Sequence, residues 1–160
     1  MRKQVFPWVF VLVFCLLTAG LTSYVAWGQP WTQSRGGPED VIFDNGNIYA
    51  VFNGPKGQTS FTIQERYQIT RITNYHWNFE NGAEPGIISI RDAAGNILGR
   101  WQATTRPGQG GVPNAYWDVY PDIVLSAGKY TILDSDPSTW SCNAENDNHG
   151  MSQVYGYPTR

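Results

Sequence analysis

Apolar residues follow two different patterns along this chain. From residue 5 to about residue 25 they form one long run, rich in Val, Phe and Leu, that contains no charged residue and follows Arg2 and Lys3. After residue 40, short runs with alternating apolar and polar positions are separated by clusters of Gly, Pro, Asn and Asp. The first pattern is typical of an export signal, and the second indicates short β-strands joined by tight turns.

The expected strands recur at intervals of roughly ten residues. They cover residues 48–52, 59–64, 67–73, 74–79, 86–91, 97–104, 116–125, 129–133 and 152–157, with a bulge expected between the third and the fourth. No segment after the leader keeps a 3.6-residue apolar period, which argues against helices. The pattern therefore predicts an all-β fold, an antiparallel two-sheet β-sandwich that is jelly-roll-like.

The leader predicts export. Ala26-Trp27-Gly28 fits the small-x-small pattern of a signal peptidase site, and cleavage there would leave Gln29 as the first residue. The apolar run is longer than a typical signal core, so an uncleaved membrane anchor is the alternative. We expect a signal peptide at residues 1–28, a linker or arm at 29–40 and a β-sandwich domain at 41–160, located outside the cell.

Charge excludes one class of partner. Without Arg2 and Lys3, nine basic residues face thirteen acidic ones, and no cluster of Lys or Arg is present. Phosphate-binding glycine motifs are also absent from the sequence. Nucleic acid is therefore not an expected partner, and a membrane is expected only if the leader is uncleaved.

Cysteine usage leaves two alternatives. Once the leader is removed, Cys142 is the only cysteine, so no disulfide can form within the chain. A buried thiol is the more frequent role of such a residue, and a disulfide to a second chain is the other. Self-association could therefore use Cys142 or the arm at residues 29–40.

Residues 74–79 combine polar and aromatic side chains in strict alternation. In a strand, one face would carry Asn74, His76 and Asn78, and the other would carry three aromatic rings. We expect the rings in the core, because large rings fill sandwich interiors. The three polar side chains would then face outward, where two amides and an imidazole can contact a sugar, or simply water.

The segment that follows the 129–133 strand is dense in oxygen ligands. Hard oxygen donors concentrated in one loop are what Ca²⁺ requires, which makes calcium a candidate ligand. The four candidate ligands are Asp134, Asp136, Asn143 and Asp147. The alternative is a corner in which the aspartates accept backbone N–H bonds, Pro137 fixes φ and Trp140 fills the core.

Aromatic residues outside this segment add candidates for sugar stacking. Trp101, Tyr116, Trp117 and Tyr120 would stack on sugar faces if they were exposed, and would fill the core if they were not. The residues expected to bind a ligand are Asn74, His76, Asn78, Trp101, Trp117 and Trp140. No nucleophile-elbow motif or metal-ligand spacing accompanies the histidines, so no catalytic residue is assigned.

Several motifs resemble a known domain family. They include His76-Trp77-Asn78, the Gly- and Pro-rich residues 107–114, and the sequence Asp-Ser-Asp-Pro-Ser-Thr-Trp-Ser at 134–141. The chain resembles, over roughly residues 41–157, an uncharacterised secreted β-sandwich domain family of bacteria and archaea that ends in this signature. It departs from the family at Gly150-Met151-Ser152, where Gly-Phe-Ala is expected. The family has no assigned activity, so the resemblance implies a secreted β domain and no mechanism.

The sequence thus favours a secreted, non-catalytic binding module for carbohydrate or a cell-surface polymer. The alternative is a structural or assembly subunit of a surface layer or filament.

Overall fold

The computed structural model describes residues 39–159, so the predicted signal peptide and most of the predicted arm lie outside the described residues. The chain divides into two units, residues 1–33 and 34–160, and every described residue belongs to the second. Strands dominate this part, with three single-turn 3₁₀ segments: η1 (Asn78–Glu80), η2 (Gln109–Gly111) and η3 (Ala144–Asn146). None of the described helical segments is long and apolar enough to cross a membrane.

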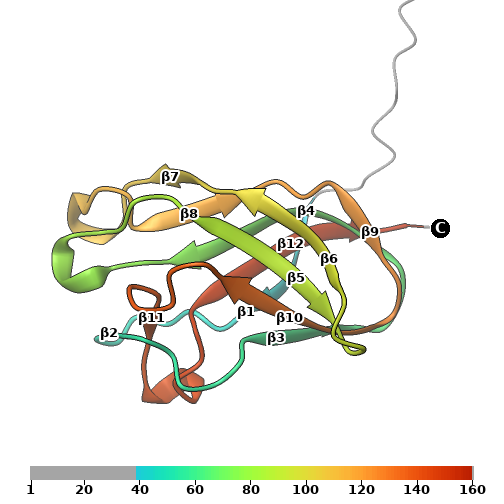
Figure 1. Ribbon diagram of the computed structural model, residues 1–160, viewed down its shortest axis with the longest axis horizontal. Coiled ribbons are helices and arrows are strands. Elements are labelled where there is room, and N and C mark those ends of the chain that lie inside the picture. The colour runs from blue at the N-terminus through green and yellow to red at the C-terminus, as the bar shows by residue number, and fades with distance from the viewer. Residues whose placement is uncertain (1–38, 160) are drawn as a thin grey trace, which may run out of the picture. The chain divides into compact units, whose positions relative to one another are not determined.

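Two antiparallel sheets form the body of the domain (Figure 1). The six-stranded sheet runs β1 (Asp40–Asp44), β12 (Ser152–Pro158), β4 (Tyr67–Tyr75), β8 (Tyr116–Val119) and β7 (Thr104–Arg106), with β9 (Ile123–Leu125) also on β4. The four-stranded sheet runs β3 (Ser60–Ile63), β10 (Gly128–Asp134), β5 (Ile87–Asp92) and β6 (Ile97–Gln102). A small third sheet pairs β2 (Phe52–Asn53) with β11 (Ser141–Cys142).

The core lies between the two large sheets. Each contributes apolar side chains to one cluster, such as Ile72 and Val154 from the six-stranded sheet and Ile88 and Ile132 from the four-stranded one. The chain passes repeatedly from one sheet to the other, and the resulting order β1-β12-β4-β8 against β3-β10-β5-β6 is that of a jelly roll. The predicted all-β, antiparallel two-sheet fold is confirmed.

Some expected strand boundaries were wrong. In the 48–52 segment only Phe52 belongs to a strand, and Ile48 is 94% exposed. The 116–125 strand is interrupted because Pro121 has no N–H to donate and Asp122 adopts a left-handed φ of 50°. The strands β1 and β11 were not expected from the sequence.

The expected orientation of residues 74–79 was also wrong. A bulge at Thr70, between the pairs Ile69↔Gly156 and Arg71↔Tyr155, changes which residues face the core, so both Ile69 and Ile72 are fully buried. Alternation from Ile72 then carries Asn74 inward and Tyr75 outward. His76 is 0% exposed, whereas Phe79, expected in the core, is 64% exposed.

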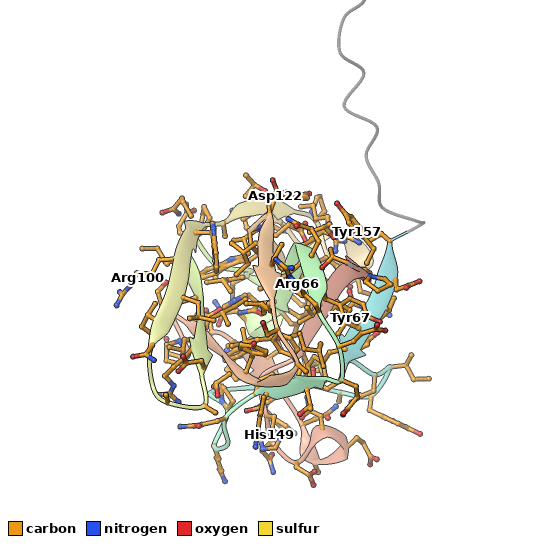
Figure 2. All side chains as sticks on the ribbon, turned by 90° about the vertical axis from the view of Figure 1, so that its right-hand side faces the viewer. Arg66, Tyr67, Arg100, Asp122, His149 and Tyr157 are labelled. Carbon is orange, nitrogen blue, oxygen red and sulfur yellow. The ribbon has the colours of Figure 1, made fainter. Side chains whose placement is uncertain are left out.

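The sandwich has two distinct ends. At one, β1 begins and β12 ends, since Asp40 pairs with Gly156; Tyr67 and Tyr157 lie here (Figure 2). We call this the terminal end. At the other, the open end, β4 finishes and β8 begins with the pair Tyr75↔Tyr116. The loops that join the strands at the open end form the surface described below.

Candidate functional site

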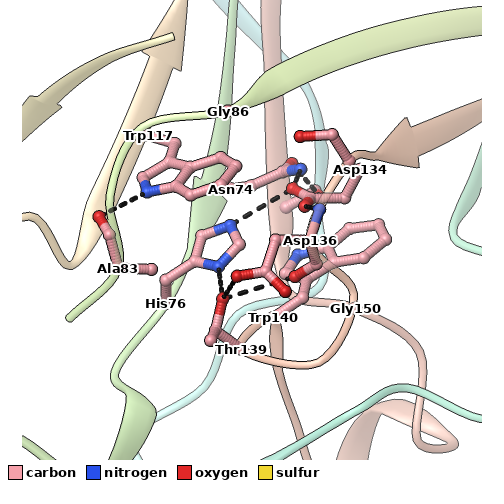
Figure 3. Close-up of polar contacts among 12 residues, drawn as sticks. Asn74, His76, Ala83, Gly86, Trp117, Asp134, Asp136, Thr139, Trp140 and Gly150 are labelled. Atoms are coloured by element: carbon pink, nitrogen blue, oxygen red, sulfur yellow. Dashed lines mark hydrogen bonds and ion pairs between the residues drawn. The ribbon is translucent and has the colours of Figure 1, made fainter. Parts of the chain in front are cut away.

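The signature at residues 134–141 forms a corner at the end of β10 (Figure 3). The Asp134 side chain is 0% exposed. Its Oδ1 accepts the backbone N–H of Asp136 at 2.8 Å, and its Oδ2 accepts from Asn74 Nδ2 at 2.6 Å and contacts His76 Nε2 at 3.1 Å. The hydroxyl of Ser135 accepts the N–H of Ile87 at 2.8 Å. These bonds tie the corner to both sheets.

His76 lies at the centre of this network. Its ring stacks on Trp117 with centroids 3.8 Å apart and planes 19° from parallel. The indole of Trp117 is itself fixed, since Nε1 donates to the carbonyl of Ala83 at 3.2 Å. Gly86 allows this packing, because a Cβ there would lie 2.8 Å from the Trp117 ring. The imidazole is therefore held by the Trp117 ring on one face and by a hydrogen-bond partner at each ring nitrogen.

Thr139 links His76 to Asp136. Thr139 Oγ1 lies 2.8 Å from Asp136 Oδ2 and 2.9 Å from His76 Nδ1. A hydroxyl has one proton, so when it donates to the Asp136 carboxylate it accepts from His76 Nδ1–H. The other ring nitrogen, Nε2, lies 3.1 Å from Asp134 Oδ2, so both nitrogens of the imidazole have a hydrogen-bond partner.

Asp134, His76 and Thr139 form the acid–histidine–hydroxyl arrangement of a catalytic triad, but their hydrogen bonds do not suit its chemistry. A triad needs the imidazole to take the hydroxyl proton, whereas the hydroxyl of Thr139 is directed toward Asp136. The side chains of His76 and Asp134 are 0% exposed, so no substrate reaches them. This network stabilises the corner rather than performing a reaction.

Asp136 makes the corner sensitive to acid. Burial by itself would raise the pKa of Asp136, but hydrogen bonds from the hydroxyls of Ser138 and Thr139, together with His76, outweigh burial and lower the pKa below its ordinary value. The folded protein therefore holds this carboxyl ionised at a pH where the unfolded chain begins to protonate it.

Asp136→Asn should reduce the acid sensitivity of the fold. Because the pKa is lower in the folded state than the unfolded value of about 3.9, the ionised group contributes stability above that pH. This contribution is lost as the pH falls through the lower folded pKa. In urea titrations, the free energy of unfolding of the wild type should fall more steeply between about pH 5 and pH 2 than that of Asp136→Asn. Glu84→Gln, which removes one negative charge from an exposed loop, should keep the wild-type slope; equal slopes in wild type and Asp136→Asn would contradict this account.

The four expected calcium ligands do not form a common site. Asp134 and Asp136 accept hydrogen bonds within the corner. The amide of Asn143 pairs with that of Asn47 through two hydrogen bonds of 2.8 and 3.0 Å. Asp147 is exposed, at the end of η3 with φ 57°. Within residues 39–159 no group of three or more His, Cys, Asp or Glu side chains could hold a metal ion. The corner interpretation is the one that fits.

Four of the six expected sugar-binding side chains were placed wrongly, because they are buried. Asn74, His76 and Trp117 are 0% exposed and Trp140 is 4% exposed. Trp101 packs against the core and over Gly99, where a Cβ would lie 2.2 Å from its ring. Asn78 donates to the carbonyl of Gly82 at 2.7 Å and accepts from Asn53 at 2.8 Å. The four buried side chains therefore specify the fold, whereas Trp101 and Asn78 are half-buried.

Cys142 is also internal. Its side chain is free and 3% exposed, on the short strand β11. Burial raises the pKa of the Cys142 thiol, and the nearby Lys56 opposes this only in part. A buried, protonated thiol is a poor partner for a disulfide with a second chain, which favours the first of the two expected roles.

A groove of about 300 Å³ lies at the open end of the six-stranded sheet. It is bounded by the segment after β1, the end of β4, the start of β8, the loop with η2 and the start of β12. We call it the end groove. Its lining residues are Asp44, Gly46, Asn47, Ile48, Thr73, Tyr75, Gln109, Tyr116, Met151, Ser152 and Gln153.

Two tyrosines set the shape of the end groove. The rings of Tyr75 and Tyr116 lie 4.8 Å apart with planes tilted by 37°, and the guanidinium of Arg106 lies 3.9 Å above the Tyr116 ring. The loop with η2 approaches closely because Gly108 has no side chain; a Cβ there would lie 2.5 Å from that of Ala115. Burial, and then the neighbouring Tyr116, raise the pKa of Tyr75, so its hydroxyl remains protonated and able to donate.

The lining mixes polar with apolar groups and carries little charge. Hydroxyl and amide groups alternate with apolar surface, and Asp44 is the one charged residue among those that line the groove. Its carboxylate is already occupied, because it accepts from the N–H of Gly46 and from Gln153 Nε2. Such a surface offers donors and acceptors to a neutral polar ligand. No Lys or Arg is among the lining residues, and Arg106, above the Tyr116 ring, is paired with Asp118 at 2.7 Å.

Sequence reasoning found only part of this groove. Tyr116 belonged to the aromatic residues singled out for stacking, but Asn47, Tyr75, Gln109 and Gln153 were not identified as ligand contacts. One signal was available: Ile72 lies two and four residues before Asn74 and His76, which places Tyr75 on the outer face. Nothing in the sequence showed that the η2 loop and the segment after β1 approach the same point.

Comparison with known proteins adds no identity. No family model and no curated protein matches this chain. Among solved structures, the chain is similar to the core of the Drosophila protein NLP, whose crystal structure concerns pentamer formation and histone binding. The identity is 10%, the match covers 71% of this chain and 100% of that chain, and the TM-score is 0.34. A TM-score this low does not establish a common fold, and the resemblance to a secreted domain family stays a prediction.

Proposed function

We propose that this chain is an exported, non-catalytic domain that binds a saccharide in the end groove. The observation that carries the proposal is the lining of the groove, in which hydroxyls and amides surround the edges of two tyrosine rings. Saccharides present the matching surface, since each ring alternates hydroxyl groups with apolar C–H patches. The volume of about 300 Å³ is at the lower limit of ordinary ligand sites, which suits one or two sugar units.

The charges favour a neutral saccharide. The groove lacks Lys and Arg among its lining residues, so a phosphate, sulfate or uronate would lose its hydration without gaining a cation. A neutral sugar exchanges hydrogen bonds with water for hydrogen bonds with groups such as the amide of Gln109 and the hydroxyl of Tyr75. This exchange gives modest affinity and good selectivity.

The groove also supports a role without catalysis. Hydrolysis of a glycosidic bond needs two carboxyl groups on either side of the bond, and the lining supplies only Asp44. The buried triad-like network at the corner is out of reach of any ligand. Binding without turnover is the function that fits these residues.

Two variants test the groove. Ile48→Ala and Gln109→Ala each remove one lining side chain from an exposed loop position, so neither should change the stability of the fold. Each is expected to weaken saccharide binding by about 2- to 10-fold, the effect of losing one hydrogen bond or apolar contact. A glycan array would identify a ligand, and isothermal titration with that glycan would measure the affinities.

Matched controls lie on the other sheet. Ile97→Ala, on the edge strand β6, and Gln64→Ala, after β3, remove the same side chains from exposed positions away from the groove and should leave affinity unchanged. The proposal fails if the folded protein binds no glycan on the array and no insoluble polysaccharide. A stable oligomer or filament of the isolated domain in size-exclusion chromatography, without glycan binding, would instead indicate an assembly role.

A further inference from the structure

Large apolar side chains continue outward from the end groove. Ile48 is 94% exposed, Tyr49 62%, Phe52 63% and Phe79 64%. We call these four residues the apolar rim. Ile48 belongs both to the lining of the groove and to the segment that leads to β2, so the rim is continuous along the chain with the groove. Exposed apolar groups gathered at one end of a domain indicate an interaction surface.

Phe79 is exposed at a cost in backbone energy. Asn78, Phe79 and Glu80 have φ values of 45°, 51° and 68°, three consecutive residues in the left-handed region. For Phe and Glu this conformation is unfavourable, because the Cβ comes close to the following carbonyl oxygen. Side-chain amides hold the turn, including that of Asn81, which donates to the carbonyls of Asn78 and Phe79 at 2.9 and 3.1 Å. These bonds hold the backbone of the turn that carries the exposed Phe79 ring.

The turn and the segment after the groove are joined. Asn53 Nδ2 donates to Asn78 Oδ1 at 2.8 Å, so each partner of this bond has an exposed phenylalanine as its chain neighbour, Phe52 or Phe79. Figure 1 places β2 and the loop after β4 together at the end of the sandwich away from the C-terminus. The rim therefore spans from the groove to the tip of the η1 loop.

We propose that the ligand is a long, neutral polysaccharide, bound through an internal stretch of its chain. This inference rests on the proposed function and extends it: the end groove holds one short stretch, and the apolar rim stacks against the sugar units that follow. The electron-rich face of an aromatic ring attracts the polarised C–H groups of a sugar, so Phe52 and Phe79 supply further subsites.

Charge favours a sugar polymer over a protein as the occupant. No Lys, Arg, Asp or Glu lies between Asp44 and Lys56, and the rim residues there are interspersed with amides and small residues: Asn45, Gly46, Asn47, Ala50, Asn53 and Gly54. Protein interfaces surround an apolar centre with a charged and polar rim that fixes the partner. Glu80, beside Phe79, is the charged residue of the η1 turn. The uncharged strip at residues 45–55 matches a neutral chain with repeated hydroxyl and C–H surfaces.

The test is the dependence of affinity on chain length. The probes are neutral β-1,4-linked gluco-, xylo- and manno-oligosaccharides, from disaccharide to the longest soluble oligomer, measured by isothermal titration with the folded domain. Phe79→Asn is the informative variant, because Asn tolerates the left-handed region and so removes the ring while keeping the turn. The wild type should bind a long oligomer about 10-fold more tightly than the disaccharide. Phe79→Asn should lower only long-oligomer affinity, by about 2- to 10-fold.

The outcomes separate the two proposals. Tyr120→Asn, at an equally exposed aromatic residue beyond the other end of β8, is the control and should bind every oligomer like the wild type. If affinity does not depend on length, or if Phe79→Asn has no effect, the polymer inference is overturned while saccharide binding stands. If no saccharide binds, both fail. A dimer seen by analytical ultracentrifugation that Phe79→Asn dissolves would assign the rim to a second copy and overturn the inference.

Discussion

Asp134→Ala is expected to lower the free energy of unfolding by about 3–5 kcal/mol, the usual result of removing one partner from a buried polar pair. The substitution would leave the amide of Asn74, the Nε2 of His76 and the N–H of Asp136 without their acceptor. The side chains of Asp134 and His76 are 0% exposed, so water cannot replace the carboxylate without opening the corner. Urea denaturation followed by tryptophan fluorescence measures the loss.

Two further variants make this prediction specific. Glu84→Ala removes an acidic side chain from an exposed loop and should change stability by less than about 0.5 kcal/mol. The double variant Asp134→Ala with His76→Ala should be less destabilised than the sum of the two single variants, because the two side chains share one network. Additive effects, or a loss below about 1 kcal/mol for Asp134→Ala, would show that the network contributes little.

Trp140→Ala is expected to cost about 3–5 kcal/mol, as for other large-to-small changes at buried aromatic residues. Trp140 is 4% exposed, and its Nε1 donates to the carbonyl of Met151 at 2.9 Å. Its ring lies against Gly150, where a Cβ would be 2.1 Å from Cε2. Because residue 150 is a glycine, it has no side chain that could fill the space left by the Trp140 ring. Thermal unfolding by differential scanning calorimetry measures the effect.

Position 150 supplies the matched control. Gly150→Ala alone should destabilise the fold by about 1–3 kcal/mol, because the added methyl group overlaps the Trp140 ring. In the Trp140→Ala background the same methyl group has room, so it should cost less or even stabilise. If Gly150→Ala were equally harmful with and without the tryptophan, the packing described here would be wrong. Tyr120→Ala, at a residue 64% exposed, should have little effect.

The fold could be predicted because its strands repeat a local signal. Alternation around Phe61 and Ile63, or around Ile88 and Ile90, follows from period-2 geometry alone, and these residues are buried as that geometry requires. The burial of Trp140 at the signature corner was one of two stated alternatives and is confirmed. The interruption of the 116–125 strand has two causes: Pro121, which the sequence shows, and the left-handed conformation of Asp122, which no periodic pattern reveals.

The site was harder to predict because the residues that contact one another there are far apart in the sequence. His76 is satisfied by Asp134 and Thr139, which lie 58 and 63 residues away, so the sequence alone could not show that a histidine beside three aromatic rings faces inward. Because we assumed that the aromatic rings fill the core, the expected inner and outer faces of residues 74–79 were the reverse of the observed ones. The bulge at Thr70 and the apolar residue Ile72 set the orientation instead. The end groove needs five separate segments, and pairing of β4 with both β8 and β12 brings most of them together.

The pairing of β1 with β12 has a consequence for how this domain can be joined to other proteins. Asp40 and Gly156 are partners in an antiparallel pair, so the chain enters and leaves the fold within about 5 Å. A domain with adjoining ends can be inserted into a surface turn of a host protein through short spacers without stretching either one. The end groove and the apolar rim lie at the opposite end of the sandwich, so they would point away from the host. Copies grafted in this way along a scaffold would display their grooves in parallel, and a repetitive polymer could then engage several of them at once.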